Sequence, residues 1–307
     1  MRDALPGNSS WPMVSVIVPT YNDARSLRRC LSAIESQKLS GSFETIVVDN
    51  GSAQSLDEVR AAFPNIIFLY EETPGSYGAR NAGIAIARGE ILAFTDSDCQ
   101  PAIDWLQNGV EFLLTHQEIA AIGGRIDVES ANHSTASIAA LYDSICSFPQ
   151  RRYVEQLRFS ATANLMTRKS VMNSVGPFAT ELRSGGDREW GNRLVAGGFR
   201  LAYVENVIVQ HAVRSSKREI YKKVRRTVAG DRDLHRNLHR TWSGLVWEVV
   251  KDAAPPVREA YALLFGKGKS FPLQQKVAVL FFAWRLRLWR AYQRILLQFD
   301  NSASPRQ

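Results

Sequence analysis

Two aspartates separated by one residue, Asp96 and Asp98, are the side chains best suited to chemistry in this sequence. They directly follow the apolar run Ile91 to Thr95, which predicts a buried strand, so both carboxylates would lie on the loop after that strand. Carboxylate oxygens are the ligands that Mg²⁺ and Mn²⁺ prefer. A metal bound there would bridge the two phosphates of a nucleoside diphosphate and neutralise the charge on the leaving group. Taken alone the motif is a weak signal, because solvated turns have the same composition.

Two other polar clusters also follow predicted strands. Thr20-Tyr21-Asn22 comes after the run Val14 to Val18, which ends at Pro19, and Asp49-Asn50-Gly51-Ser52 comes after the run Phe43 to Val48. In open α/β sheets the ligand crevice lies at the carboxyl ends of the strands. Turn residues follow many strands, but three polar clusters that meet at one edge of a sheet predict a binding site.

The elements that position these clusters alternate between strand and helix. Helices are predicted over 24–37 and 79–88, the second ended by Gly89, and a third strand is predicted over 66–69. This alternation is typical of βαβ units with right-handed connections, and it predicts a doubly wound α/β fold, with a mainly parallel sheet and helices on both faces. Beyond residue 119 the pattern predicts strands over 120–128, 164–166 and 200–209, and helices over 137–148, 187–196, 216–231, 244–251, 256–265 and 273–299.

Four stretches occur in order and at close to regular spacing: VSVIVPTYN (14–22), VVDNGS (47–52), GARNAG (78–83) and ILAFTDSD (91–98). Together they resemble family-2 glycosyltransferases of the GT-A fold. The resemblance continues through 163–166 (ANLM), 175–178 (VGPF) and 186–189 (GDRE) to the strand end at 209–211 (VQH). Each piece is unspecific, but the combination is specific and covers roughly two-thirds of the chain. It implies a GT-A catalytic domain over 12–214, followed by a helical basic region over 215–307.

The resemblance implies nucleotide-binding roles for four residues. Pro19 and Tyr21 should border the nucleoside base, with Tyr21 offering a stacking face. Asp49 should hydrogen-bond the base or the ribose, because a carboxylate at a strand end accepts from an imide N–H or a hydroxyl. Arg80 should reach the donor phosphates, whose oxygens match the guanidinium fork. We expect UDP as the nucleotide, because Tyr21 and Asp49 suit a uracil site and the family favours it; GDP and dTDP are the alternatives.

The metal ligands implied by the resemblance are two carboxylates and an imidazole. Asp98 should be the main ligand, and Asp96 should lie near the ribose and assist it. His211, at the end of a predicted strand, matches a histidine that often supplies a further ligand. A lone histidine after a strand is usually structural, so both interpretations of His211 stay open.

Asp187 is the expected catalytic base. Members of the family place an acidic pair at the start of a helix, and its aspartate deprotonates the acceptor hydroxyl. The matching positions here read Gly186-Asp187, so the first acid of the pair is missing, and Glu189 follows two residues later. Attack by the deprotonated hydroxyl would invert the anomeric centre. Capping of the helix is the alternative role for Asp187.

The cysteines and the start of the chain indicate the compartment. Three widely spaced cysteines argue against a disulfide framework and favour a reducing environment. The first thirteen residues show no basic-then-apolar signal sequence. Both observations predict a cytoplasmic protein.

The net charge of +8 is unevenly distributed. Residues 1–213 carry 18 Lys and Arg against 23 Asp and Glu, whereas residues 214–307 carry 20 against 7. A basic segment on a mildly acidic body predicts an anionic partner, either nucleic acid or phospholipid. No nucleic-acid-binding module is recognised, so a membrane surface is favoured.

The last predicted helix, 273–299, is amphipathic. On a helical wheel Lys276, Arg287, Arg290 and Arg294 share one face, and large aromatic and aliphatic side chains share the other. Its longest charge-free apolar run has eight residues, far fewer than the roughly 20 of a spanning helix. The basic stripe therefore predicts peripheral attachment to an anionic leaflet on the cytoplasmic face. Packing of the apolar face onto the catalytic domain is the alternative.

These features predict a metal-dependent, inverting glycosyltransferase that moves a single sugar from a nucleotide sugar to a saccharide or lipid-linked saccharide. Surface polysaccharide or glycolipid synthesis is the expected setting. Nucleotidyl transfer is an alternative, but those enzymes usually open with a glycine-rich signature after the first strand. A catalytically inactive scaffold of the same fold is another, although Asp98 and Asp187 are both present.

Overall fold

The computed structural model describes residues 13–129, 136–182, 184–236 and 242–299 of the chain. The described residues fall into two compact units. The first lies within Met1–Asp127, Pro149–Thr180 and Gly186–His211, and the second within Val128–Phe148, Glu181–Gly185 and Ala212–Gln307. Besides the basic C-terminal region, the second unit thus includes a helix from the middle of the chain.

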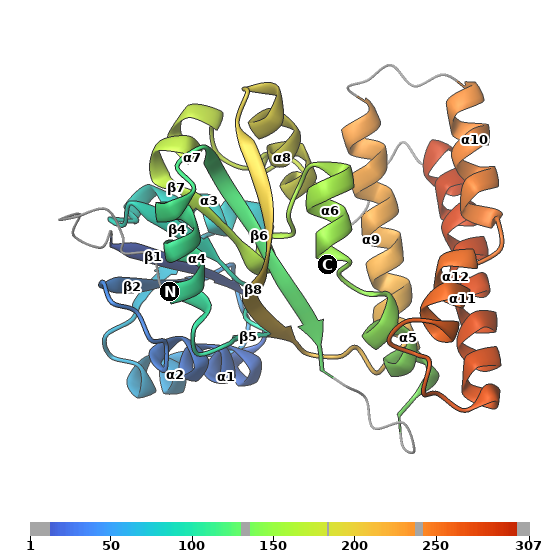
Figure 1. Ribbon diagram of the computed structural model, residues 1–307, viewed down its shortest axis with the longest axis horizontal. Helices are drawn as coiled ribbons and strands as arrows, with labels where there is room; N and C mark the ends of the chain where they lie inside the picture. Colours follow the sequence, from blue (N-terminus) through green and yellow to red (C-terminus); the bar gives the residue numbers. More distant parts are fainter. Residues whose placement is uncertain (1–12, 130–135, 183, 237–241, 300–307) are drawn as a thin grey trace. The chain divides into compact units, whose positions relative to one another are not determined.

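The first unit is built on an eight-stranded sheet of order β3-β2-β1-β4-β7-β6-β8-β5 (Figure 1). The pairs β2–β3, β1–β2 and β1–β4 are parallel, whereas β4–β7, β6–β7 and β5–β8 are antiparallel. The sheet is therefore mixed, and the parallel arrangement holds for its first half. The strands are β1 (Val14–Thr20), β2 (Phe43–Asp49), β3 (Ile67–Tyr70), β4 (Ile91–Phe94), β5 (Cys99–Pro101), β6 (Ile119–Val128), β7 (Leu165–Arg168) and β8 (Arg200–His211).

The change of direction occurs at the centre of the sheet. The 3₁₀ turn Thr162–Asn164 leads directly into β7, and Leu165 at the start of β7 pairs with Phe94 at the end of β4. Since β7 begins beside the last residue of β4, it must run back along that strand. The hydroxyl of Thr95 donates to the carbonyl of Ala163 at 3.1 Å and fixes this junction.

Helices and the sheet share one core in the first unit. Every residue of β1 is buried, as expected for a strand covered on both faces. The helices of this unit are α1 (Ala24–Glu35), α2 (Asp57–Ala62), α3 (Ser76–Ile86), α4 (Trp105–Thr115), α6 (Gln150–Leu157), α7 (Lys169–Val175) and α8 (Gly186–Ala196). The expected α/β fold is confirmed. Five elements of this unit were not predicted from the sequence: α2, α4, α6, α7 and β5.

The prediction that Gly89 ends a helix was wrong. Helix α3 ends at Ile86, three residues earlier, and Gly89 has no positive φ. A Cβ at Gly89 would lie 2.5 Å from the backbone nitrogen of Ser15, so glycine is needed for the close approach to β1. Gly198, in contrast, has the left-handed conformation of a helix-ending glycine after α8, with a φ of +82°.

The second unit contains α5 (Ile138–Cys146), α9 (Lys217–Arg236), α10 (Trp242–Ala253), α11 (Val257–Leu264) and α12 (Leu273–Phe299). Buried side chains of α5, α9 and α12 form a cluster around Ile220, Phe282 and Leu286. A second cluster joins α5, α11 and α12 around Leu141, Leu263 and Val279. None of the helices in the described part of the chain is both long enough and apolar enough to cross a membrane.

The prediction that a basic stripe on α12 faces an anionic leaflet was wrong. Arg294 is buried and forms ion pairs with Asp231, Glu248 and Asp252 of α9 and α10. The neighbouring members of the stripe are also engaged inside the unit. Arg290 pairs with Asp231 and Asp252, Arg287 donates to the carbonyls of Lys251 and Ala254, and Lys276 donates to the carbonyl of Lys269. The stripe is structural because acids and backbone carbonyls of the same unit bind its cations.

Replacing Arg294 with alanine should destabilise the protein by about 3–5 kcal/mol, because it removes a buried cation, leaves Glu248 without this partner and leaves Asp231 and Asp252 with Arg290. The exposed Arg285 of the same helix supplies the control, and Arg285→Ala should change stability by less than about 0.5 kcal/mol. Urea unfolding of both variants measures the difference. Equal stability of the two would show that the Arg294 ion pairs contribute nothing.

Candidate active site

The loop after β4 and the end of β8 bring an aspartate and a histidine together. Cys99, the first residue of β5, pairs with His211, the last residue of β8. This pairing sets Nε2 of His211 3.3 Å from Oδ2 of Asp98. Ligand atoms of Asp98, Cys99 and His211 all lie within 4.8 Å of one another. The three side chains therefore surround a point where a cation would fit.

The donor atoms at this point suit Mn²⁺ or Mg²⁺. The Asp98 carboxylate is partly exposed, and His211 presents an imidazole nitrogen although only 2% of its side chain is accessible. Oxygen and nitrogen donors match these cations, with Mn²⁺ the more tolerant of imidazole. The Cys99 thiol fits less well, because burial raises its pKa and keeps it protonated. Asp98 and His211 are thus the residues that would hold a metal.

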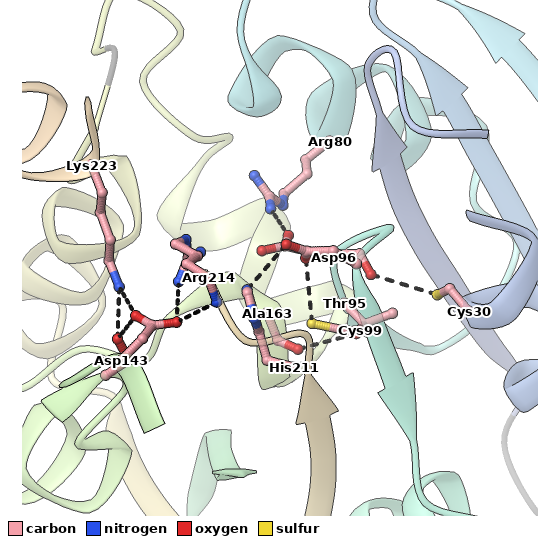
Figure 2. A network of polar contacts seen from close by, with 12 residues as sticks. Cys30, Arg80, Thr95, Asp96, Cys99, Asp143, Ala163, His211, Arg214 and Lys223 are labelled. Carbon is pink, nitrogen blue, oxygen red and sulfur yellow. Dashed lines mark hydrogen bonds and ion pairs between the residues drawn. The ribbon is translucent and has the colours of Figure 1, made fainter. Parts of the chain in front are cut away.

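Asp96 faces a different partner. Its carboxylate forms an ion pair with the guanidinium of Arg80, which is only 3% exposed (Figure 2). The backbone carbonyl of Asp96 accepts from the Cys99 amide at 3.0 Å and from the Cys30 thiol at 3.5 Å. The structure therefore fixes Asp96 firmly, but it directs the carboxylate to Arg80 and outside the Asp98–His211 group.

Arg80 links Asp96 to the expected base. Its guanidinium carbon lies 5.7 Å from the ring centroid of Tyr77, one turn earlier on α3. The Tyr77 hydroxyl donates to Oδ1 of Asp187 at 3.3 Å. Contacts thus run from the loop after β4, through α3, to the first turn of α8. No function was predicted for Tyr77 from the sequence, because nothing in its local pattern distinguishes it from a core aromatic residue.

Asp187 lies at the second position of α8 and is partly buried. Burial raises the pKa of its carboxyl above the usual range, and the Arg188 amide, Arg80 and the Tyr77 hydroxyl act in the opposite direction. Its Oδ1 accepts from the Arg188 amide at 2.9 Å, one residue along, which is not the bond of an N-cap. A carboxyl with a raised pKa is a better proton acceptor once it is ionised.

Packing explains why position 186 has no acidic side chain. A Cβ on Gly186 would lie 2.7 Å from Cε2 of Tyr77, so the tyrosine ring occupies the space next to Asp187 that a side chain would need. The tyrosine hydroxyl, rather than a second carboxyl, is the group that contacts the base.

Tyr77→Phe should lower turnover about tenfold and shift the acid limb of the pH–rate profile to higher pH. The tyrosine hydroxyl lowers the Asp187 pKa, so its removal raises that pKa, and a base is active only above its pKa. Turnover measured across pH with the donor saturating tests this. The Tyr77 ring remains in phenylalanine, so folding should be kept, and an unmoved profile would count against the contact.

Three of the predicted nucleotide-binding residues lie at the carboxyl ends of β1 and β2. Tyr21 directly follows β1 and is 58% exposed, so one ring face is free for stacking. Pro19 is buried within β1, opposite Val48. Asp49 ends β2, is 8% exposed, and its Oδ1 accepts from the Ser52 amide at 3.0 Å.

Two asparagines tie these loops together. The Asn22 amide donates to the Ser52 hydroxyl at 2.8 Å, and the Asn22 side chain accepts from the Ala53 amide at 2.8 Å. Asn50 donates to the Thr73 carbonyl at 2.7 Å and accepts from the Gly75 amide at 2.6 Å, just before α3. The loops after β1 and β2 and the start of α3 are therefore joined directly, and Arg80 of α3 connects them to Asp96 in the loop after β4.

A buried asparagine, Asn164, holds β8 in place. Asn164 is inaccessible to solvent, accepts from the Trp105 indole at 2.9 Å and donates to the carbonyls of Arg125 and Val207 at 2.8 and 2.9 Å. It thereby links α4, β6 and β8, the strand that ends at His211. Asn164 belongs to the motif at 163–166, but no function was predicted for it from the sequence.

Solved structures with the same fold are GT-A glycosyltransferases. A mannosyltransferase from Pyrobaculum calidifontis, solved in complex with GDP-Man and Mn²⁺, superposes with a TM-score of 0.54 over 99% of this chain and 79% of its own, at 20% identity. TarS of S. aureus (residues 1–349) superposes with a TM-score of 0.53 over 94% of this chain and 92% of its own, at 16% identity. At these identities the likeness establishes the fold: the first unit is of GT-A type.

Sequence comparison gives the family. The model of glycosyl transferase family 2 matches residues 15–176. Glycosyltransferase AglE of Haloferax volcanii is 34% identical over 91% of this chain and 94% of its own length. A dolichyl N-acetyl-α-D-glucosaminyl phosphate 3-β-D-2,3-diacetamido-2,3-dideoxy-β-D-glucuronosyltransferase of Methanococcus voltae is 26% identical over 68% of this chain and 70% of its own. The chain belongs to glycosyl transferase family 2, and it is a glycosyltransferase.

Proposed function

We propose that this enzyme transfers a single sugar from a nucleoside diphosphate sugar, with UDP favoured, to a saccharide or lipid-linked saccharide, in a metal-dependent reaction that inverts the anomeric centre. One observation carries the proposal. A partly buried carboxylate with a raised pKa, Asp187, is connected through Tyr77 and Arg80 to the loop that holds Asp96 and Asp98. A proton acceptor and a phosphate-side cation site on one framework are what sugar transfer from a nucleotide needs.

The nucleotide would bind across the three polar loops. Tyr21 offers its exposed ring to the base, and Asp49 accepts a hydrogen bond from the base or ribose. Asp96 is held in one orientation by Arg80 and serves the ribose side. The Arg80 guanidinium donates to Asp96 and to the Ser76 carbonyl, so its predicted contact with the donor phosphates would use its remaining N–H groups.

Asp98 and His211 would hold the divalent cation. When bound, it supplies positive charge to the diphosphate leaving group. Asp187 takes the proton of the acceptor hydroxyl as that oxygen attacks the anomeric carbon from the side opposite the leaving phosphate. Tyr77 keeps one oxygen of Asp187 engaged and so orients the other.

The acceptor proposal extends to a lipid-linked saccharide at the cytoplasmic face of a membrane. The relative from Methanococcus voltae is named for a dolichyl phosphate-linked substrate, which supports that class. A soluble saccharide acceptor is the other form of the same chemistry. Nucleotidyl transfer is not retained, because the family is that of glycosyltransferases.

Thermal-shift measurements of the purified protein test the donor and the metal together. UDP, GDP, dTDP and ADP are each added with and without Mn²⁺. A nucleotide at about 100 times its dissociation constant should add roughly 2.7 kcal/mol of stability. We expect a manganese-dependent rise in Tm with UDP. A rise in Tm with GDP alone would identify guanine instead of uracil as the base of the donor. No rise with any nucleotide in a folded sample would favour the inactive scaffold.

A further inference from the structure

The second unit exposes an unusually large set of apolar side chains. Soluble proteins seldom expose extended apolar surface unless it contacts a partner or a membrane. Fifteen large hydrophobic residues, fourteen in α10–α12 and Phe265 directly after α11, are more than 40% exposed. They are Val246, Trp247 and Val250 of α10, Val257, Tyr261 and Leu264 of α11 with the adjoining Phe265, and Leu273, Val277, Phe281, Trp284, Leu288, Tyr292, Ile295 and Leu296 of α12. We call this set the apolar face.

On α12 the apolar face is a single stripe. Its members from Leu273 to Ile295 recur every three or four residues, which is the spacing of one side of a helix. At 1.5 Å per residue the stripe is about 33 Å long. Helices α10 and α11 both pack against α12 and carry the other members of the apolar face. The opposite side of α12 carries the arginines that pair with acids inside the unit.

The charges around the apolar face have one sign. Among the described residues of α10–α12, no acid is exposed. Glu248 and Asp252 face Arg294 inside the unit, and Glu259 is half-buried. The exposed charged residues of α10–α12 and their connections are Lys251, Arg258, Lys267, Lys269 and Arg285. The surface is therefore apolar and cationic without a compensating negative charge.

We propose that the apolar face inserts into the interfacial layer of an anionic membrane, with its cations placed at the lipid phosphates. Aliphatic side chains mixed with Trp and Tyr and bordered by Lys and Arg suit the boundary between acyl chains and headgroups. This deepens the membrane part of the proposed function and replaces the buried arginine stripe as the contact. A second copy fits less well, because a symmetric pairing would bring five cations on each copy together with no exposed acid opposite them.

Flotation of the full chain with lipid vesicles tests the proposal. The vesicles consist of phosphatidylcholine alone or of phosphatidylcholine with phosphatidylglycerol. One variant removes apolar contacts (Phe281→Ser, Trp284→Ser, Leu288→Ser), and another removes charge (Arg258→Gln, Lys269→Gln, Arg285→Gln). Ile86→Ser with Ile103→Ser is the matched control, because both isoleucines are exposed in the first unit. Every substituted side chain is exposed, so the variants should keep the Tm of the parent.

The parent protein and the control should float with the anionic vesicles. The apolar variant should partition at least about tenfold less into both kinds of vesicle. The charge variant should lose the preference for anionic lipid. Brominated acyl chains should quench the tryptophan fluorescence of the parent, and Trp247→Phe with Trp284→Phe should remove most of that quenching.

Three results would overturn the proposal. The parent fails to float with either vesicle, the apolar variant floats like the parent, or the parent is a dimer in solution that the apolar variant converts to a monomer. The last result would make the apolar face an interface between copies. The nucleotide thermal shift, measured on the same samples, separates the two proposals: a shift without flotation rejects only the membrane face, and flotation without a shift rejects only the transfer reaction.

Discussion

Asp98→Ala should abolish manganese-dependent binding of the nucleotide and reduce transfer to background. The substitution removes the carboxylate that lies 3.3 Å from the His211 imidazole, and with it the main oxygen donor of the candidate metal site. Loss of a residue that only supports a ligand costs about 10–100-fold in metal affinity, so loss of the ligand should cost at least about 100-fold. Titration of Mn²⁺ in the presence of UDP measures the effect.

Asp104→Ala is the matched control for this variant. Asp104 is an exposed aspartate a few residues along the chain, and its side chain does not cap α4. Its replacement should leave nucleotide and metal affinity unchanged. Unchanged manganese affinity in Asp98→Ala would remove Asp98 as a ligand. Unchanged affinity in both Asp98→Ala and His211→Ala would place the cation elsewhere.

Asp187→Asn should keep donor binding but lower turnover by about 10²–10⁴-fold, the range that a positioned general base contributes. Asparagine preserves the size of the side chain and can still accept from the Tyr77 hydroxyl, so the fold and the nucleotide loops should be unaffected. The carboxyl of Asp187 has a raised pKa, and activity of the parent should therefore increase as the pH rises through that pKa. The residual activity of the variant should lack this limb.

Glu189→Gln provides the control, since Glu189 is the other acid in the first turn of α8. Both of its carboxylate oxygens accept from Arg193, at 2.7 and 2.9 Å, so they are already engaged. This variant should retain most of the turnover. If Glu189→Gln were the inactive variant and Asp187→Asn the active one, the roles of the two acids would be reversed.

The parallel half of the sheet could be predicted because its signals are local. Apolar runs, an amphipathic helix between them and polar residues after each strand all lie within short windows of sequence. Their positions place Thr20, Asp49 and Asp96 at one edge of the sheet; the structure joins the loops after β1 and β2 directly and connects them to Asp96 through Arg80 of α3. The short elements β5, α2 and α7 were missed, because three to seven residues carry too little pattern.

Helix α4 was also missed, although it is longer than these elements. Its buried residues Trp105, Leu106, Gly109, Val110 and Leu113 recur with helical spacing, so a signal was present in the sequence. In the second half of the sheet, β6, β7 and β8 overlap predicted strands, but their antiparallel direction had no local signal. It depends on where β7 begins relative to β4, which is a matter of tertiary packing.

The sequence by itself determined the type of fold, the edge of the sheet that carries the polar loops, and the identity of the candidate base and metal ligands. Only the tertiary structure decided which of them meet. His211 reaches Asp98 through the pairing of β5 with β8, and Tyr77 reaches Asp187 across 110 positions of the chain. The tertiary structure also decided which face of α12 is buried. A helical wheel separates a basic stripe from an apolar one, but the choice of the buried stripe depended on acids supplied by α9 and α10.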